Sequence, residues 1–168
     1  MFKEYGSDKD STHSYDTVYP KLLSKYVGKK ASLLEIGVFG GGSMKAWKNF
    51  LVDGIITGMD FNAEPPGEYE FIRLDVSNKE VLSEKVKNRK FDIIIDDGSH
   101  LLEHQLIAAE VLIDHLNQDG IYVVEDLQSI ENWDKFSKFG VVELIDLRGI
   151  KNRYDDVLVV IRAKLSSS

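Results

Sequence analysis

The 168-residue chain contains no cysteine, and no part of it is a long apolar run. Without cysteine, disulfides and thiolate metal sites are excluded, while the redox compartment stays open. No run approaches the roughly 18 apolar residues of a membrane span, and the opening MFKEYGSDKD lacks the apolar core of a signal peptide. These absences predict a cytoplasmic protein that does not bind a membrane.

Positive charge is also scarce, because 21 Lys and Arg stand against 28 Asp and Glu, for a net charge of −7. Phosphate recognition relies on basic patches, so nucleic acid is disfavoured as a partner, and small molecules and cations are favoured. The length suits one domain. We therefore expect a single domain over 1–168, with a lid or helix segment at 1–28 and a frayed tail at 165–168.

Short β-branched runs alternate with helical patterns, which is typical of a parallel sheet covered by helices on both faces. Parallel strands are expected at 31–37, 54–60, 69–74, 91–96 and 120–126. Runs at 141–147 and 156–162 predict an antiparallel hairpin closing one edge. Helices are expected at 14–27, 43–52, 78–88 and 102–116, and a loop at 62–67. The predicted fold is Rossmann-like α/β, with a seven-stranded, mostly parallel sheet.

Ligands of such sheets bind beyond the carboxyl ends of the strands. The first strand ends in LLEIGVFGGGS, where glycines would let the backbone approach a ligand, although a tight turn needs glycines as well. The spacing GxxGGG and the acidic Glu35 differ from the GxGxxG of dinucleotide binders. Asp60 closes the second strand, where it could accept ribose hydroxyls, and Asp75 follows the third, where it could receive an exocyclic amine.

Two acidic pairs end the fourth and fifth strands, namely Asp96 with Asp97 and Glu125 with Asp126. If these strands are neighbours, the pairs lie roughly 5 Å apart and repel each other unless a cation sits among them. Oxygen ligands favour magnesium, with manganese or calcium as alternatives.

His100 follows Asp97 by three residues, close enough to share a substrate with such a cation. An imidazole could take the proton of a hydroxyl acidified by the metal. An ordinary structural hydrogen bond is the alternative role. A zinc protease site is disfavoured, because Leu101 stands where the motif of two histidines, here His100 and His104, requires glutamate.

Taken in order, these strand ends resemble those of the class I methyltransferases, which use S-adenosylmethionine (SAM). The resemblance implies that Glu35 and the loop at 37–42 hold the methionine part, Asp60 the ribose, and Asp75 with Val76 the adenine. The alternative interpretation is that Glu35, Asp60 and Asp75 are solvated residues at strand ends that bind no ligand, and for any one of them considered alone this is the more common case. The residues so expected to bind the cofactor are Glu35, Gly37, Gly40, Ser43, Asp60, Asp75, Val76 and Asp96.

The motifs DDGSH and ED, with the N-terminal YGSDKDSTHSYDTVY, resemble the metal-dependent sugar O-methyltransferases of the macrocin and mycinamicin type. That resemblance implies Asp97, Glu125 and Asp126 as ligands of Mg²⁺ (or Mn²⁺), His100 as general base, and a glycoside, saccharide or other small diol as acceptor. The chain is shorter than those enzymes, so the acceptor's identity does not carry over.

The segment 5–19 would be the natural lid, with Asp8, Lys9, His13 and Tyr15 facing the cofactor; a polar lead into the first helix is the alternative. Because few insertions cover the strand ends, a homo-oligomer is also expected. Three other functions stay open: a hydroxylase-like enzyme of antibiotic tailoring, a non-catalytic nucleotide-binding module and, less favoured, a dehydrogenase.

Overall fold

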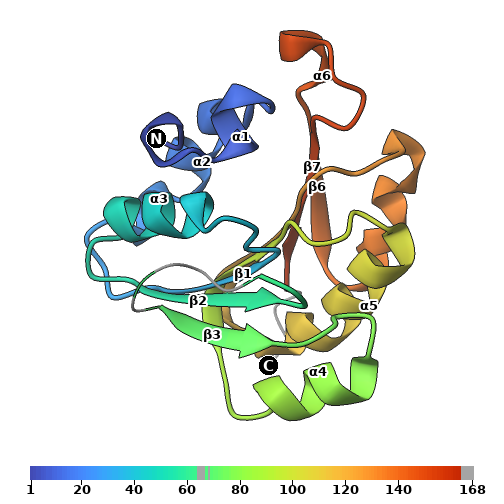
Figure 1. The fold of residues 1–168 in the computed structure, drawn as a ribbon. Helices are drawn as coiled ribbons and strands as arrows, with labels where there is room; N and C mark the ends of the chain where they lie inside the picture. Colours follow the sequence, from blue (N-terminus) through green and yellow to red (C-terminus); the bar gives the residue numbers. More distant parts are fainter. Residues whose placement is uncertain (64–66, 68, 164–168) are drawn as a thin grey trace.

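A seven-stranded sheet forms the centre of the computed structural model, which describes residues 1–63, 67 and 69–163 (Figure 1). The strand order is β3-β2-β1-β4-β5-β7-β6. The first five strands are parallel, and β7 runs antiparallel to both β5 and β6. The strands are β1 Ser32–Ile36, β2 Ile55–Asp60, β3 Glu70–Arg73, β4 Phe91–Asp96, β5 Leu116–Val124, β6 Val141–Asp146 and β7 Val157–Arg162. The predicted fold class is confirmed.

Three of the four predicted helices are confirmed to within a few residues, as α3 Gly42–Phe50, α4 Lys79–Val86 and α5 Leu102–Leu112, the last extended by the 3₁₀ turn η4 Ile113–His115. Further short helices that the sequence did not predict are η1 Lys3–Tyr5, α1 Asp8–Ser11, η5 Ile130–Lys138 and α6 Arg148–Lys151. Asn78 caps α4, because its side chain accepts a hydrogen bond from the Val81 amide. The expected 165–168 tail and part of the 62–67 loop lie outside the described residues.

The single helix expected at 14–27 is wrong. The segment instead forms three short turns, η2 Tyr15–Thr17, α2 Tyr19–Leu22 and η3 Ser24–Tyr26. Pro20 lacks a backbone N–H and is tolerated only in the first turn of a helix, where it stands in α2, so a helix that begins at residue 14 cannot continue past it unbroken. Tyr15 and Tyr19, which lie in these turns, are completely buried.

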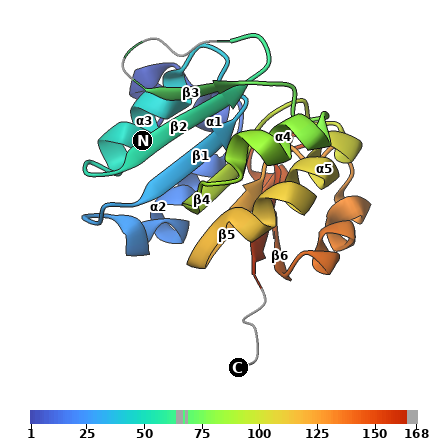
Figure 2. The same cartoon turned by 90° about the horizontal axis from the view of Figure 1, so that it is seen from below.

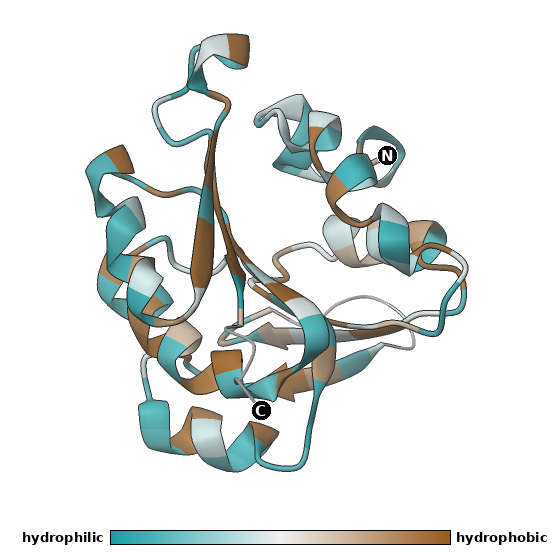
Figure 3. Ribbon diagram, turned by 180° about the vertical axis from the view of Figure 1, so that it is seen from behind, coloured by the Kyte–Doolittle hydropathy of each residue, from teal (hydrophilic) through white to brown (hydrophobic). Residues whose placement is uncertain are grey.

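Helices cover both faces of the sheet (Figure 2). On one face Leu34 and Ile36 of β1 join the core under α4 and α5, while on the other Leu33 joins the core under α3 and the N-terminal segment. The alternation follows from the pleat of a strand, which sends successive side chains to opposite faces. Hydropathy colouring shows the apolar stretches of the strands and the polar positions on the helices (Figure 3). None of the described helices is long and apolar enough to cross a membrane.

The strand order changes direction between β1 and β4, which lie side by side in the middle of the sheet. Because β1 to β5 are parallel, their carboxyl ends share one edge. The acidic and glycine-rich segments therefore meet at the position where open α/β sheets bind their ligands.

Candidate active site

A pocket of about 350 Å³ opens at the carboxyl ends of β1, β2 and β4. Four of the eight residues expected to bind a cofactor line it, namely Gly37, Asp60, Asp75 and Val76. The other lining residues are Ile36, Phe61, Asn62, Gly98, Ser99 and His104.

Asp60, at the end of β2, organises the rim of this pocket. One carboxylate oxygen accepts hydrogen bonds from the amides of Asn62 and Ala63, at 2.8 and 2.9 Å, and the other accepts from Val38 at 2.8 Å. Partial burial opposes ionisation, but these backbone donors outweigh it and lower the pKa of Asp60. The carboxylate is thus kept ionised between the loops that follow β1 and β2.

Glu35 takes a different position from Asp60, because it is fully buried beneath the glycine-rich loop. Its carboxylate accepts hydrogen bonds from the Ser43 hydroxyl at 2.7 Å and from Trp47 Nε1 at 3.0 Å. Burial raises the pKa of Glu35, against the opposing effect of Lys9. Glu35 and Ser43 are therefore hydrogen-bonded to each other, and their contact with a cofactor stays a prediction.

Two glycines of the loop after β1, Gly37 and Gly40, differ in whether the structure requires glycine at their positions. Gly37 has a φ of 85°, and a Cβ there would lie 1.9 Å from the carbonyl oxygen of Asp97. Only glycine therefore lets the loop after β4 cross the end of β1. A Cβ at Gly40 would meet nothing within 4 Å, so packing does not explain that residue.

The two acidic pairs meet as predicted, since the ladder between β4 and β5 continues when the Glu125 amide donates to the Asp96 carbonyl oxygen at 2.9 Å. Asp96, however, is buried on the face of the sheet that carries Tyr122, and it accepts a hydrogen bond from Tyr122 Oη at 3.1 Å. Burial raises the pKa of Asp96 to about 6. It does not line the pocket, and a role for it in cofactor binding stays a prediction.

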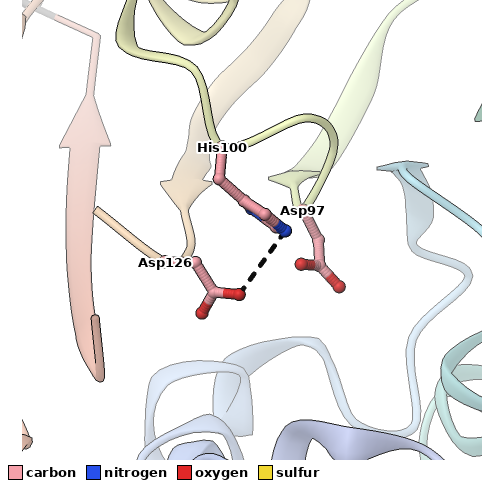
Figure 4. A group of neighbouring side chains, drawn as sticks. All are labelled: Asp97, His100 and Asp126. Carbon is pink, nitrogen blue, oxygen red and sulfur yellow. Dashed lines mark ion pairs between the residues drawn. The ribbon is translucent and has the colours of Figure 1, made fainter. Parts of the chain in front are cut away.

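Asp97, His100 and Asp126 form the open half of the acidic group (Figure 4). Each offers one ligand atom, and these atoms lie within 4.8 Å of one another. His100 Nε2 is 3.7 Å from Asp126 Oδ2, and the His100 side chain is 34% exposed. Two carboxylates and an imidazole are a suitable donor set for a divalent cation, so the described residues fit a metal.

Two residues of the open half have left-handed backbones, with φ of 57° at His100 and 54° at Asp126. Such a conformation costs a non-glycine residue roughly 1–2 kcal/mol. Strain of this kind gathers at functional sites, where surrounding structure holds it in place. Both turns direct their side chains toward the same space, as Figure 4 shows.

Lys9, Glu35 and Glu125 form the closed half of the group. Lys9 Nζ lies 2.6 Å from Glu125 Oε2 and 3.6 Å from Glu35 Oε1, and it also reaches Asp97 Oδ2 at 2.5 Å. The other oxygen of Glu125 accepts the hydroxyl hydrogen of Tyr19. Burial opposes the charge of Lys9, but the three carboxylates outweigh it and raise the pKa of Lys9. Asp97 therefore belongs to both halves.

His13 and Tyr15 approach the acidic group from the same N-terminal segment. The Tyr15 hydroxyl donates to Asp126 Oδ1, and His13 Nδ1 lies 3.2 Å from that oxygen. Asp8 is exposed at the start of α1. Lys9, His13 and Tyr15 thus contact the acidic side chains, and their closure over a cofactor stays a prediction. Tyr19 was missed by the sequence reasoning, which assigned it only to a helix.

A second hollow, of about 450 Å³, lies near the tip of the β6–β7 hairpin. Both of its arginines are already paired, Arg148 with Asp146 and Arg153 with Asp155. With its charges satisfied internally, this hollow offers no chemistry comparable to that at the strand ends.

Comparisons with known proteins show which family the chain resembles in sequence and fold. No family model matches the chain. It is 33% identical over 145 residues to 8-demethyl-8-alpha-L-rhamnosyl tetracenomycin-C 2'-O-methyltransferase of Streptomyces olivaceus, covering 79% of this chain and 38% of that protein. It is 32% identical over 161 residues to demethylmacrocin O-methyltransferase of Streptomyces fradiae, covering 88% and 40%.

Among solved structures, the MycE methyltransferase in complex with Mg, SAH and mycinamycin VI is similar, with a TM-score of 0.71 and 30% identity. The match covers 80% of this chain and 38% of that one. The chain belongs to the SAM-dependent sugar O-methyltransferases and has the class I methyltransferase fold. Its curated relatives are sugar O-methyltransferases, as the motifs predicted, and it spans about 40% of the length of those it matches.

Proposed function

We propose that the chain transfers a methyl group from SAM to a hydroxyl of a sugar or another small diol, assisted by a divalent metal and a histidine base. The observation that carries this proposal is the open half, which places two carboxylates and His100 beyond the ends of β4 and β5, beside the β1 loop. The relatives' names supply the substrate class, and SAH in the MycE complex supports the cofactor.

In this mechanism Asp97 and Asp126 would hold the metal, most simply Mg²⁺, which would lower the pKa of a nearby acceptor hydroxyl. His100 takes the hydroxyl proton. Asp126, 3.7 Å from His100 Nε2, then stabilises the imidazolium. The acceptor oxygen forms its bond to the methyl carbon as the bond from that carbon to sulfur breaks, and the positive charge on sulfur is lost.

The pocket at β1, β2 and β4 would hold the nucleoside, with Asp60 toward the ribose and Asp75 and Val76 toward the adenine. Glu125 is expected to be the third metal ligand from the family resemblance, yet its oxygens contact Lys9 and Tyr19. His100 could occupy that place, since its ring belongs to the group that could hold an ion. Metal affinity of His100→Ala separates the two roles: a base leaves the affinity near normal, and a ligand lowers it.

Calorimetric titration with SAM, SAH and NAD, each with and without Mg²⁺, tests the cofactor. SAM and SAH should bind, and NAD should not. Methyl transfer is then measured with rhamnose-, fucose- and glucose-type glycosides and with catechol, because these present hydroxyls of the expected class. Binding of NAD in preference to SAM, or full transfer after chelation of metal, would contradict the proposal.

A further inference from the structure

Lys9 is the most unusual residue of the molecule, because its side chain is only 1% exposed and yet carries a charge. Its ammonium lies among carboxylates from the ends of three strands, Glu35 of β1, Asp97 after β4 and Glu125 after β5. A buried charge is tolerated when it is paired in this way. The residue comes from α1, a helix of four residues far away in the sequence.

The Lys9 ammonium lies between the acidic ends of β4 and β5, where the sequence predicted a metal cation. The Lys9 ammonium donates hydrogen bonds to Asp97 Oδ2 at 2.5 Å and to Glu125 Oε2 at 2.6 Å. The second oxygen of Glu125 accepts a hydrogen bond from the Tyr19 hydroxyl. Asp97 and Glu125 are also two of the three carboxylates that the family resemblance assigns to a metal. A metal ion drawing on these two carboxylates would lie next to a fixed positive charge, which repels it.

We propose that the Lys9 ammonium and a divalent cation compete for Asp97 and Glu125, so that metal binding and the burial of the Lys9 side chain are coupled. The inference rests on the proposed function, because it deepens the description of that metal site. Linkage requires reciprocity: if Lys9 weakens metal binding, then bound metal loosens Lys9 by the same factor. Each direction gives a separate measurement.

The segment has anchors that do not depend on Lys9. The rings of Phe2 and Tyr19 each pack against Trp47 at 4.8 Å between centroids. The Tyr15 hydroxyl also holds Asp126. Release of one side chain can therefore occur without loss of the whole segment, and a Lys9 variant retains these contacts.

Mn²⁺ binding, followed by the electron paramagnetic resonance of the free ion, tests the first direction. Lys9→Met, a neutral side chain of similar length, should bind Mn²⁺ at least tenfold more tightly than the wild type. Lys21→Met is the matched control, because Lys21 is exposed on α2 and its loss changes the net charge equally. The control should bind within twofold of the wild type. Equal or weaker binding by Lys9→Met would overturn the inference.

Amine labelling of the wild-type protein tests the second direction and does not depend on the variant's folding. Acetylation of Lys9, followed by mass spectrometry, should be slow without metal and at least fivefold faster at saturating Mn²⁺, while Lys21 reacts equally in both. Unchanged protection of Lys9 at saturation would contradict competition. If wild type and Lys9→Met bind Mn²⁺ equally, the inference fails alone; if neither binds it, the metal of the proposed function fails as well.

Discussion

The two halves of the acidic group contain similar residues and differ in their access to water. In the closed half, Lys9 and Glu125 are each 1% exposed at the side chain, and Glu35 is completely buried. In the open half, the side chain of His100 is 34% exposed, that of Asp97 19% and that of Asp126 9%. A buried carboxylate needs a fixed counter-charge from the chain itself, whereas a carboxylate at the surface can exchange a cation with solvent. Solvent access thus distinguishes Asp97 and His100, which solvent reaches, from Glu35 and Glu125, which it does not.

The largest expected effect of a substitution is in the open half. His100→Ala should reduce methyl transfer by about 10²–10⁴-fold, the usual contribution of a positioned base, while SAH still binds. Raising the pH should restore part of the rate, because hydroxide can then take the proton. Turnover is measured with the first active acceptor of the glycoside panel.

His115→Ala is the control for this substitution, since His115 lies in η4 and its ring contacts the Arg89 carbonyl at the opposite ends of the strands. It should keep near-normal turnover. Full activity of His100→Ala on a true acceptor would show that the open half is a structural strand end.

The closed half should respond in stability. Lys9→Met leaves three carboxylates without their buried partner, and breaking a buried ion pair on one side typically costs about 3–5 kcal/mol. Urea denaturation without metal should show a loss of this size in the free energy of unfolding. Lys21→Met, which is exposed, should change it by no more than about 0.5 kcal/mol. A small loss in Lys9→Met would mean that the closed half is hydrated in solution.

These two halves also show how far the sequence could predict the molecule. The strands and their acidic ends followed from short apolar runs and their last residues, and so did the meeting of Asp97 with Glu125 and Asp126. The position of Lys9 among them did not follow. The sequence predicted only that Lys9 would face the cofactor from a lid; lysine is almost never fully buried, and the polar run around Lys9 has no periodicity to place it.

The helix expected at 14–27 was also wrong, because the chain forms short turns there. The hydroxyls of Tyr15 and Tyr19 in these turns donate to Asp126 and Glu125, and only the folded chain creates these contacts. Pro20 was the local signal that could have prevented the error. In the segment 14–27 the sequence therefore predicted neither the short turns nor the contacts of Tyr15 and Tyr19 with the acidic group.

Asp96 provides a pH test of the rule that burial decides the role of an acid. Its pKa is raised by burial from the ordinary 3.8 to about 6, so between these values the folded protein binds more protons than the unfolded chain. Its contribution to the free energy of unfolding therefore falls as the pH rises from about 4 to about 6. The loss above that range is on the order of 3 kcal/mol.

Asp96→Asn keeps the oxygen that accepts from Tyr122 and removes the charge. The variant should match the wild type near pH 4 and be more stable at pH 7, as compared by urea denaturation at both values. Equal stability of the two proteins at pH 7 would show that Asp96 is ionised without penalty, through water that reaches the end of β4.

Asp60, an acid on the rim of the pocket, belongs to neither half. A carboxylate that accepts two ribose hydroxyls contributes roughly 1.5–3 kcal/mol for each charged hydrogen bond. Asp60→Ala should therefore weaken SAH binding at least tenfold in calorimetry. Because the same carboxylate accepts from the Val38, Asn62 and Ala63 amides, circular dichroism must show that the fold is retained. Asp53→Ala removes an exposed acid of equal charge and should bind SAH normally. An unchanged dissociation constant in Asp60→Ala would limit Asp60 to holding the two loops together.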